Sequence, residues 1–108
     1  MKIAIVGAGI VGSTAAYYLS KEKEVEVTVF DHGLGQATKV AAGIISPWFS
    51  KRRNKAWYRM ARLGADFYQE LVSALENDGY DTSFYDQSGV ALLKKDDSKL
   101  DGLYEHAE

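Results

Sequence analysis

Three glycines in the spacing GxGxxG, Gly7, Gly9 and Gly12, follow directly behind a short apolar run over residues 2–6. Nineteen residues beyond the last glycine stands Asp31, which closes a second apolar run. Strand, glycine turn, helix and acid in this order are the fingerprint of a βαβ unit that binds a dinucleotide. The pattern therefore predicts an α/β fold of the Rossmann type, with two parallel strands joined by a helix.

Each member of the fingerprint has its own physical reason. Gly7 permits a tight turn off the strand, Gly9 lets the backbone approach a pyrophosphate, and Gly12 lets the helix lie close to the sheet. The free N–H groups at a helix start suit an anionic diphosphate. The carboxylate of Asp31 can accept hydrogen bonds from a ribose 2′,3′-diol and would repel a 2′-phosphate, which favours FAD or NAD over NADP. A lone GxGxxG could equally be plain loop glycines with a solvated acid, but the strand, the helix and the spacing favour the dinucleotide interpretation.

The periodicity of apolar residues places the elements around this fingerprint. A helix is predicted from Ile10 to Lys21, and its apolar stripe is expected at Val11, Ala15, Tyr18 and Leu19. The first strand is apolar throughout, which is typical of a central parallel strand covered on both faces. The second strand is expected over residues 25–30. The glycine-spaced tract from Gly33 to Gly43 then predicts one long loop, and loops of this length are usually functional or disordered.

The amino-acid composition excludes several classes of protein. The chain has 108 residues, 46% of them hydrophobic, and a formal net charge of −2, as expected for about one globular domain. The charge balance argues against a nucleic-acid partner. Cysteine is absent, which excludes a disulfide frame and a thiolate metal site. Since the first strand begins at Lys2 and no apolar run approaches membrane-spanning length, we expect no signal peptide, no membrane span and a cytoplasmic location.

A second motif, AAGIISP at residues 41–47, follows the acidic strand end. With both motifs in view, essentially the whole chain resembles the D-amino acid oxidase family of FAD enzymes, near glycine oxidase and D-amino acid dehydrogenase. In that family a small-residue segment of this kind crosses the flavin pyrophosphate and reaches toward the isoalloxazine ring, and plain NAD dehydrogenases lack it. The resemblance therefore implies FAD as the cofactor.

The resemblance also implies which residues bind FAD. The backbone of Ile10 and Val11 would contact the pyrophosphate, Asp31 would hold the ribose diol, and His32 would line the adenosine side. The hydroxyl of Thr38 would donate to a phosphate. The whole implied set is Gly7, Gly9, Ile10, Val11, Gly12, Asp31, His32, Ala37, Thr38, Ala42, Gly43 and Ile44, the last three running under the flavin.

This sequence departs from the family pattern at two places. Many relatives have Glu at the position of Asp31, a change that keeps the carboxylate. Lys39 and Val40 stand where small polar residues are common. Lys39 is equally well explained as a phosphate partner and as a solvated loop lysine.

A long amphipathic helix is predicted from Asn54 to Asn77, with Ser50 as the candidate N-cap and Gly79 as the stop signal. Its apolar positions are expected to be core, and they are Trp57, Met60, Ala61, Gly64, Phe67, Tyr68, Leu71 and Leu75. A basic cluster at residues 51–55 opposes the helix dipole, and it fits a solvated face better than an anion contact.

Beyond this helix a β-hairpin is predicted, with strands over Thr82–Gln87 and Val90–Lys95 and a turn at Ser88 and Gly89, followed by the start of a helix over Ser98–Glu108. In the resembled family such a hairpin opens the antiparallel substrate domain. We therefore expect residues 1–78 to belong to the FAD-binding domain and residues 79–108 to begin the substrate domain.

The resemblance implies an enzyme that oxidises the C–N bond of an amino acid or amine by hydride transfer to FAD. The family's substrate arginine and active-site tyrosine lie downstream of residue 108, so we expect an N-terminal fragment with no catalytic residue of its own. His32 and His106 are the only histidines, the side chains suited to proton transfer near neutral pH, and neither is placed to act as a base.

Uncovered strand edges would favour self-association of the fragment. An NAD-dependent dehydrogenase and a non-catalytic nucleotide-binding module are the alternative interpretations.

Overall fold

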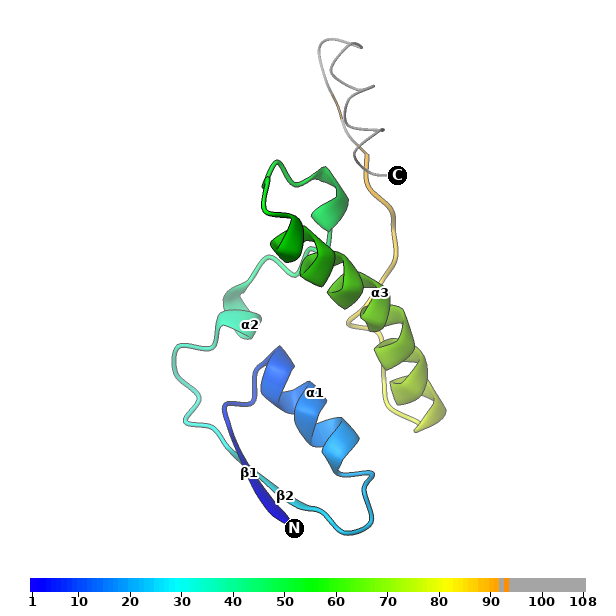
Figure 1. Cartoon of the computed structure of the whole chain (residues 1–108). Coiled ribbons are helices and arrows are strands. Elements are labelled where there is room, and N and C mark those ends of the chain that lie inside the picture. Colours follow the sequence, from blue (N-terminus) through cyan, green and yellow to red (C-terminus); the bar gives the residue numbers. More distant parts are fainter. Residues whose placement is uncertain (92, 94–108) are drawn as a thin grey trace. The chain divides into compact units, whose positions relative to one another are not determined.

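The computed structural model describes residues 1–91 and 93, and it divides the chain into two compact units (Figure 1). The first unit covers Met1–Gly43, and the second begins at Ile44. The boundary falls directly after the last small residues of the second motif. Each unit is described separately.

The first unit is a βαβ unit followed by one short helix. Its elements are β1 (Lys2–Val6), α1 (Ile10–Leu19), β2 (Glu26–Phe30) and α2 (Ala37–Val40). The strands β1 and β2 pair in parallel, in a register that runs from Lys2 opposite Glu26 to Val6 opposite Phe30. In Figure 1, α1 runs alongside this two-stranded sheet and leads back to the start of β2. The predicted Rossmann-like α/β start is thereby confirmed.

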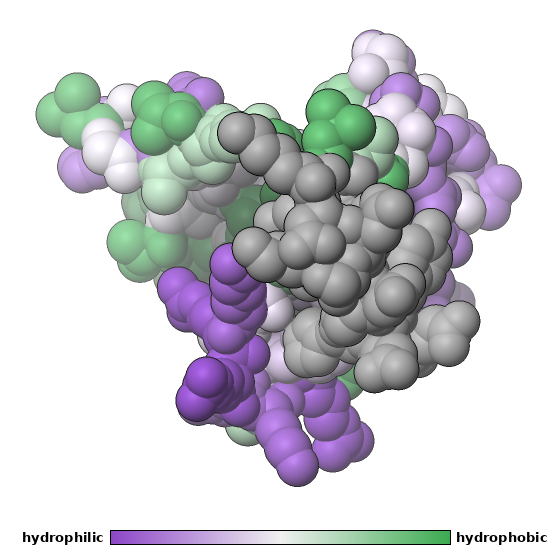
Figure 2. Space-filling model, turned by 90° about the horizontal axis from the view of Figure 1, so that it is seen from above, coloured by the Kyte–Doolittle hydropathy of each residue, from purple (hydrophilic) through white to green (hydrophobic). Residues whose placement is uncertain are grey.

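Only one face of β1 is covered within this unit. Ile3 and Ile5 are half-buried, whereas Ala4 and Val6 on the opposite face are exposed, Val6 by 88%. The prediction of a strand covered on both faces is therefore wrong for this chain. The reason is that α1 supplies a single helical layer, and side chains alternate between the two faces of a strand. Apolar residues such as Val6 reach the surface as a result. Figure 2 shows hydrophobic residues, in green, on the face of the molecule that is seen from above.

The face that α1 turns toward the sheet also differs from the predicted stripe. Val11 is 80% exposed and Ala15 is exposed, whereas Gly12, Thr14 and Ala16 are half-buried. At Gly12 the helix comes close to the first strand, because a Cβ there would lie 3.2 Å from the Cγ2 of Ile5. Of the four predicted positions, Leu19 is half-buried as expected and Tyr18 is exposed like Val11 and Ala15, so the predicted stripe was wrong at three positions. The helix also ends at Leu19, two residues before the predicted end.

The predicted long loop over residues 33–43 contains one helical turn, α2. Gln36 is its N-cap residue, and the N–H of Ala41 donates to the carbonyl of Ala37 over 2.9 Å. The prediction of a continuous loop was therefore wrong at this point. Ala37 and Lys39 are good helix formers, but a run of four residues is too short to be recognised by its periodicity.

The second unit is built on α3 (Lys55–Asn77), preceded by a 3₁₀ turn, η1 (Pro47–Phe49). Asn54 is the N-cap of α3, and its Oδ1 accepts a hydrogen bond of 3.0 Å from the N–H of Trp57. The prediction that Ser50 caps this helix is wrong, because the Oγ of Ser50 accepts a hydrogen bond from the N–H of Arg52 ahead of the helix. Arg52 also places its guanidinium 4.8 Å from the centre of the Trp57 ring, which gives the basic cluster a local cation–π partner.

The C-terminal end of α3 matches its prediction. Gly79 has a φ of +83°, the N–H of Tyr80 donates to the carbonyl of Leu75, and the N–H of Gly79 donates to that of Glu76. This pattern is a Schellman motif, which requires a left-handed backbone conformation that glycine adopts without strain.

The buried face of α3 differs from the predicted one. Its buried residues are Ala65, Leu71 and Val72, of which only Leu71 was predicted, while the predicted core residues Trp57, Met60, Gly64 and Phe67 are exposed, Met60 by 77%.

The predicted first hairpin strand, Thr82–Gln87, is not a strand in the structure. Asp81 accepts hydrogen bonds from both the N–H and the Oγ of Ser83, and the N–H of Tyr85 donates to the carbonyl of Thr82. These bonds close a turn in the segment and compete with an extended ladder. Half of the predicted second strand (residues 92, 94 and 95) and the whole predicted terminal helix, residues 98–108, lie outside the described residues, and the other residues of that predicted strand are not in a strand.

Candidate dinucleotide site

The turn between β1 and α1 has the conformation that the fingerprint requires. Gly7 has a φ of +97°, a conformation that residues with a side chain rarely adopt. Its N–H donates to the carbonyl of Phe30 over 2.7 Å, which extends the pairing of the strands by one bond. The chain then enters α1 at Ile10 through an extended Gly9 that offers no side-chain cap. The N-terminal end of α1 therefore opens at the carboxyl edge of the sheet.

Gly12 is required by the closeness of helix and turn. A Cβ at this position would lie 1.9 Å from the carbonyl oxygen of Gly7 and 3.2 Å from the Cγ2 of Ile5. Since real Cβ atoms essentially never approach backbone closer than 3.0 Å, only glycine fits here. The predicted role of Gly12 in helix–strand packing is borne out by this geometry. The space beside the Cα of Gly12 is thus occupied by the glycine turn and by Ile5.

Thr38, from α2, closes over the start of α1. Its Oγ1 accepts a hydrogen bond of 3.1 Å from the N–H of Ile10. A Cβ on Gly9 would lie 3.1 Å from the same oxygen, so the absence of a side chain at Gly9 makes room for this approach. The hydroxyl proton of Thr38 remains available for donation, because the bond to Ile10 uses the oxygen as an acceptor.

Asp31 joins the end of β2 to both neighbouring loops. Its Oδ2 accepts from the N–H of Ala8 over 2.7 Å, and its Oδ1 accepts from the N–H of Gly33 over 2.7 Å and from the Nε2 of Gln36. The hydrogen bond from Ala8 is the largest cause that holds the pKa of Asp31 below its ordinary value, followed by the bond from Gly33. Asp31 is therefore a carboxylate at neutral pH, and it acts as an acceptor.

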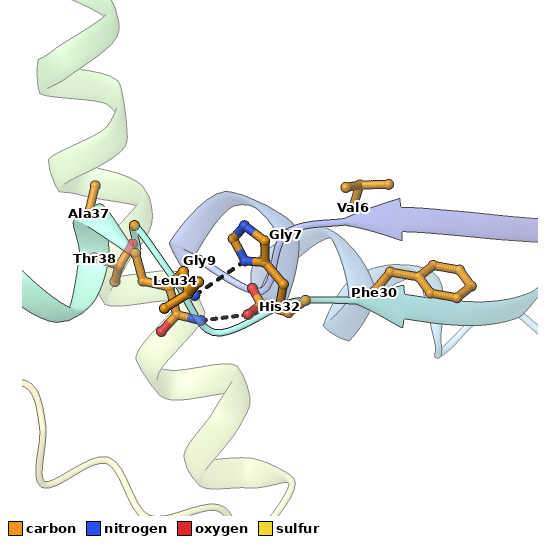
Figure 3. Close-up of a pocket in the computed structure, with 11 residues that line it drawn as sticks. Val6, Gly7, Gly9, Phe30, His32, Leu34, Ala37 and Thr38 are labelled. Carbon is orange, nitrogen blue, oxygen red and sulfur yellow. Dashed lines mark hydrogen bonds between the residues drawn. The ribbon is translucent and has the colours of Figure 1, made fainter.

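An open cleft of about 560 Å³ lies at this edge of the sheet (Figure 3). Six of the predicted site residues line it, namely Gly7, Gly9, Asp31, His32, Ala37 and Thr38. In the cleft, the Nδ1 of His32 accepts a hydrogen bond of 3.2 Å from the N–H of Leu34, as Figure 3 shows. The structure thus brings together the turn, the strand end and the loop that the sequence placed far apart along the chain.

The other predicted site residues do not line this cleft. Ile10 contributes its N–H to Thr38, and the side chain of Val11 is exposed. Ala42 and Gly43 come after α2, and Ile44 begins the second unit. Their predicted contacts to a cofactor stay predictions.

Five lining residues were not predicted, and they are Val6, Phe30, Leu34, Gly35 and Gln36. Val6 and Phe30 are the last residues of the paired strands, and ligands in open α/β sheets bind outside the carboxyl ends of strands. That rule could have found these two from the sequence. No sequence signal marks Gln36, because its place in the cleft depends on the path of the loop.

The donors and acceptors in the cleft fit the adenosine diphosphate half of a dinucleotide. The glycine turn leaves room for a ligand beside the backbone, the start of α1 presents N–H groups that have no partner within the helix, and Asp31 supplies a carboxylate. Among residues 1–91 and 93, no three acidic or histidine side chains are grouped to hold a metal ion. In the same part of the chain, no helix combines the length and the apolar character needed to cross a bilayer.

Fold and cleft together define a dinucleotide-binding α/β protein. Residues 2–108 match the family model described as FAD dependent oxidoreductase, and the chain belongs to that family. The family is FAD-dependent, which decides between the FAD and NAD alternatives in favour of FAD. No solved structure matches the chain significantly.

Individual relatives agree with this assignment. The uncharacterized oxidoreductase YurR of Bacillus subtilis is 47% identical over 104 residues, which cover 95% of this chain and 28% of YurR. A D-amino acid dehydrogenase of Allorhizobium ampelinum is 45% identical over 56 residues, covering 44% of this chain and 13% of the relative. A D-amino acid dehydrogenase of Rhodopseudomonas palustris is 49% identical over 53 residues, which cover 46% of this chain and 12% of that relative. The chain thus spans less than a third of the length of these relatives.

Proposed function

We propose that this chain holds the adenosine diphosphate half of FAD in an oxidoreductase that oxidises the C–N bond of an amino acid or amine. The observation that carries the proposal is the hydrogen bond between Asp31 and the N–H of Ala8, because it sets a ribose acceptor directly beside the glycine turn. The substrate class is supported by the relatives that are named D-amino acid dehydrogenases.

Different residues of the chain would bind different parts of FAD. The N–H groups of Val11 and Gly12 at the start of α1 would face the diphosphate, and the hydroxyl of Thr38, which accepts from the N–H of Ile10, would add one more donor. Asp31 would accept from the ribose hydroxyls. Ala42 to Ile44 would pass beneath the flavin, as the resemblance implies. FAD supplies the hydride-accepting chemistry when it is bound, and these residues hold and orient it.

We propose no catalytic residue within the described part of the chain. His32 lines the cleft at the end of β2, where the adenosine would lie, and its Nδ1 is engaged with the N–H of Leu34. It is therefore poorly placed to take a proton from a substrate at the flavin ring. We place the FAD-binding domain at residues 1–78 and the beginning of the substrate domain at residues 79–108, with the substrate-handling groups in the remainder of a protein as long as YurR.

A titration with FAD tests the binding half of this proposal. FAD added to the purified protein should lose fluorescence as it binds, and Asp31→Ala should weaken the binding by about tenfold or more, since a charge-assisted hydrogen bond pair is lost. NADH serves as the competitor ligand. Preferential binding of NADH with no response to FAD would contradict the proposal.

A turnover assay tests the chemical half. D-amino acids, glycine and sarcosine are supplied to the 108-residue chain and to a form extended over the length of its relatives, with an artificial electron acceptor present. We expect turnover only in the extended form. An extended form that binds FAD tightly and oxidises none of these amines would favour the non-catalytic binding module instead.

A further inference from the structure

The carboxylate of Asp31 has fewer vacant acceptor positions than its proposed role demands. A carboxylate offers about four lone-pair positions. Three are taken by donors of the chain itself, the N–H of Ala8, the N–H of Gly33 and the Nε2 of Gln36. A ribose diol would need two positions, and only about one is left. One of the three internal donors must therefore leave before the ribose can bind fully.

Gln36 is the donor that can leave. The N–H of Ala8 is fixed by the glycine turn, and that of Gly33 by a backbone with a φ of +78°. The Nε2 of Gln36 stands at the end of a side chain with three rotatable bonds, and Gln36 makes no side-chain cap to α2. Rotation of this side chain breaks the bond to Asp31 without disturbing any backbone.

The other end of the same amide is poorly satisfied. The Oε1 of Gln36 is buried and has no hydrogen-bond partner among the described residues. A buried acceptor without a partner destabilises the folded chain, because it has lost its hydrogen bonds to water and has formed none within the protein. Movement of Gln36 into solvent would restore a partner to this oxygen, which offsets part of the cost of giving up Asp31.

We propose that Gln36 is an internal competitor of the ribose, occupying Asp31 in the ligand-free chain and giving way to the 2′,3′-diol when the dinucleotide binds. The proposal rests on the proposed function, since it assumes that the ribose meets Asp31. Gln36 would thereby set the affinity for the cofactor by competing with the ribose for Asp31. The same loop carries Thr38 onto the N–H of Ile10, so residues 36–38 engage both the sugar end and the phosphate end of the cleft in the absence of ligand.

A comparison of two nucleotides tests this idea by calorimetry. The protein and its Gln36→Ala variant are titrated with ADP and with 2′,3′-dideoxy-ADP, which lacks both ribose hydroxyls. Gln36→Ala should bind ADP roughly five- to tenfold more tightly, because one hydrogen bond to a carboxylate no longer has to be broken. The affinity for dideoxy-ADP should stay the same, because that ligand does not displace Gln36.

Two further variants serve as controls for this test. Gln36→Met keeps the length of the side chain and removes the amide, so it should reproduce the gain in ADP affinity even if Ala loosens the loop. Gln69→Ala on α3 removes an exposed glutamine amide elsewhere and should change neither affinity. Equal or weaker ADP binding by both Gln36 variants would overturn the proposal, as would an equal gain for dideoxy-ADP. If the unaltered protein binds neither ADP nor FAD, the proposed function itself fails.

Discussion

The Oδ2 of Asp31 accepts a hydrogen bond of 2.7 Å from the backbone N–H of Ala8. The two residues are separated by 23 positions in the sequence, and this bond ties the end of β2 to the turn that follows β1. The acid expected to hold a sugar is thus fastened to the backbone expected to hold a diphosphate. This contact joins the two halves of the proposed site.

The charge of Asp31 should stabilise the folded chain in a pH-dependent manner. Its pKa is lowered from 3.8 in the folded state, chiefly by the N–H groups of Ala8 and Gly33. For a carboxyl with a lowered pKa, the stabilisation is complete above the ordinary value and is lost as the pH falls through the folded value. Asp31→Asn should therefore unfold at lower urea than the unaltered protein at neutral pH, and the difference should shrink in acid below about pH 4.

Asp66→Asn controls for the removal of one negative charge, since Asp66 lies on the exposed surface of α3. It should leave the urea midpoint nearly unchanged at neutral pH. An Asp31→Asn midpoint that matches that of the Asp66→Asn control across the whole pH range would show that the bonds to Asp31 do not stabilise the fold.

Gly12 and Gly64 are both helical glycines, and they should respond to alanine in opposite ways. Gly12→Ala forces a Cβ onto the carbonyl oxygen of Gly7, 1.9 Å away, and should lower stability by about 1–3 kcal/mol. A Cβ on Gly64 meets nothing within 4 Å, so Gly64→Ala should raise stability by about 1 kcal/mol through helix propensity. Thermal unfolding measures both. A Gly12→Ala protein as stable as the unaltered one would refute the close contact of α1 with the turn.

Gly9 should matter for the ligand more than for the fold. Its Cβ would meet only the Oγ1 of Thr38, at 3.1 Å, and that side chain can rotate away. Gly9→Ala should therefore change stability by less than about 1 kcal/mol, because a flexible neighbour yields. It should weaken FAD binding by about tenfold or more, because the backbone can no longer approach the pyrophosphate. Unchanged FAD affinity would place the diphosphate elsewhere.

The start of α3 allows a direct comparison of two capping residues. Asn54→Ala removes the acceptor of the Trp57 N–H and should cost about 1 kcal/mol. Ser50→Ala removes only the acceptor of the Arg52 N–H ahead of the helix and should cost less than half of that. Urea unfolding of the two variants decides between the caps. A larger loss for Ser50→Ala would restore the cap predicted from the sequence.

The sequence was sufficient for the βαβ unit because each of its signals is local. A glycine that needs a positive φ, such as Gly7, or a position without room for a Cβ, such as Gly12, leaves a mark at a fixed spacing. Asp31 was placed by the same spacing. The Schellman stop at Gly79 was equally predictable, since helices often end on a left-handed glycine.

Features that depend on the path of the chain in space could not be predicted in this way. Small residues of α1 such as Gly12 and Ala16 are half-buried, and hydrophobic periodicity overlooks small residues. The turn at Asp81 competes with strand formation through side-chain bonds that residue spacing does not reveal. Gln36 reaches Asp31 only because the loop folds back, so its place in the site required the structure.

A crystal structure of the protein with bound FAD tests the central claim most directly. We expect the diphosphate against the start of α1, beside Gly9, with the adenosine ribose hydroxyls on the carboxylate of Asp31. A diphosphate bound away from that helix start, or an adenosine ribose with no contact to Asp31, would contradict it.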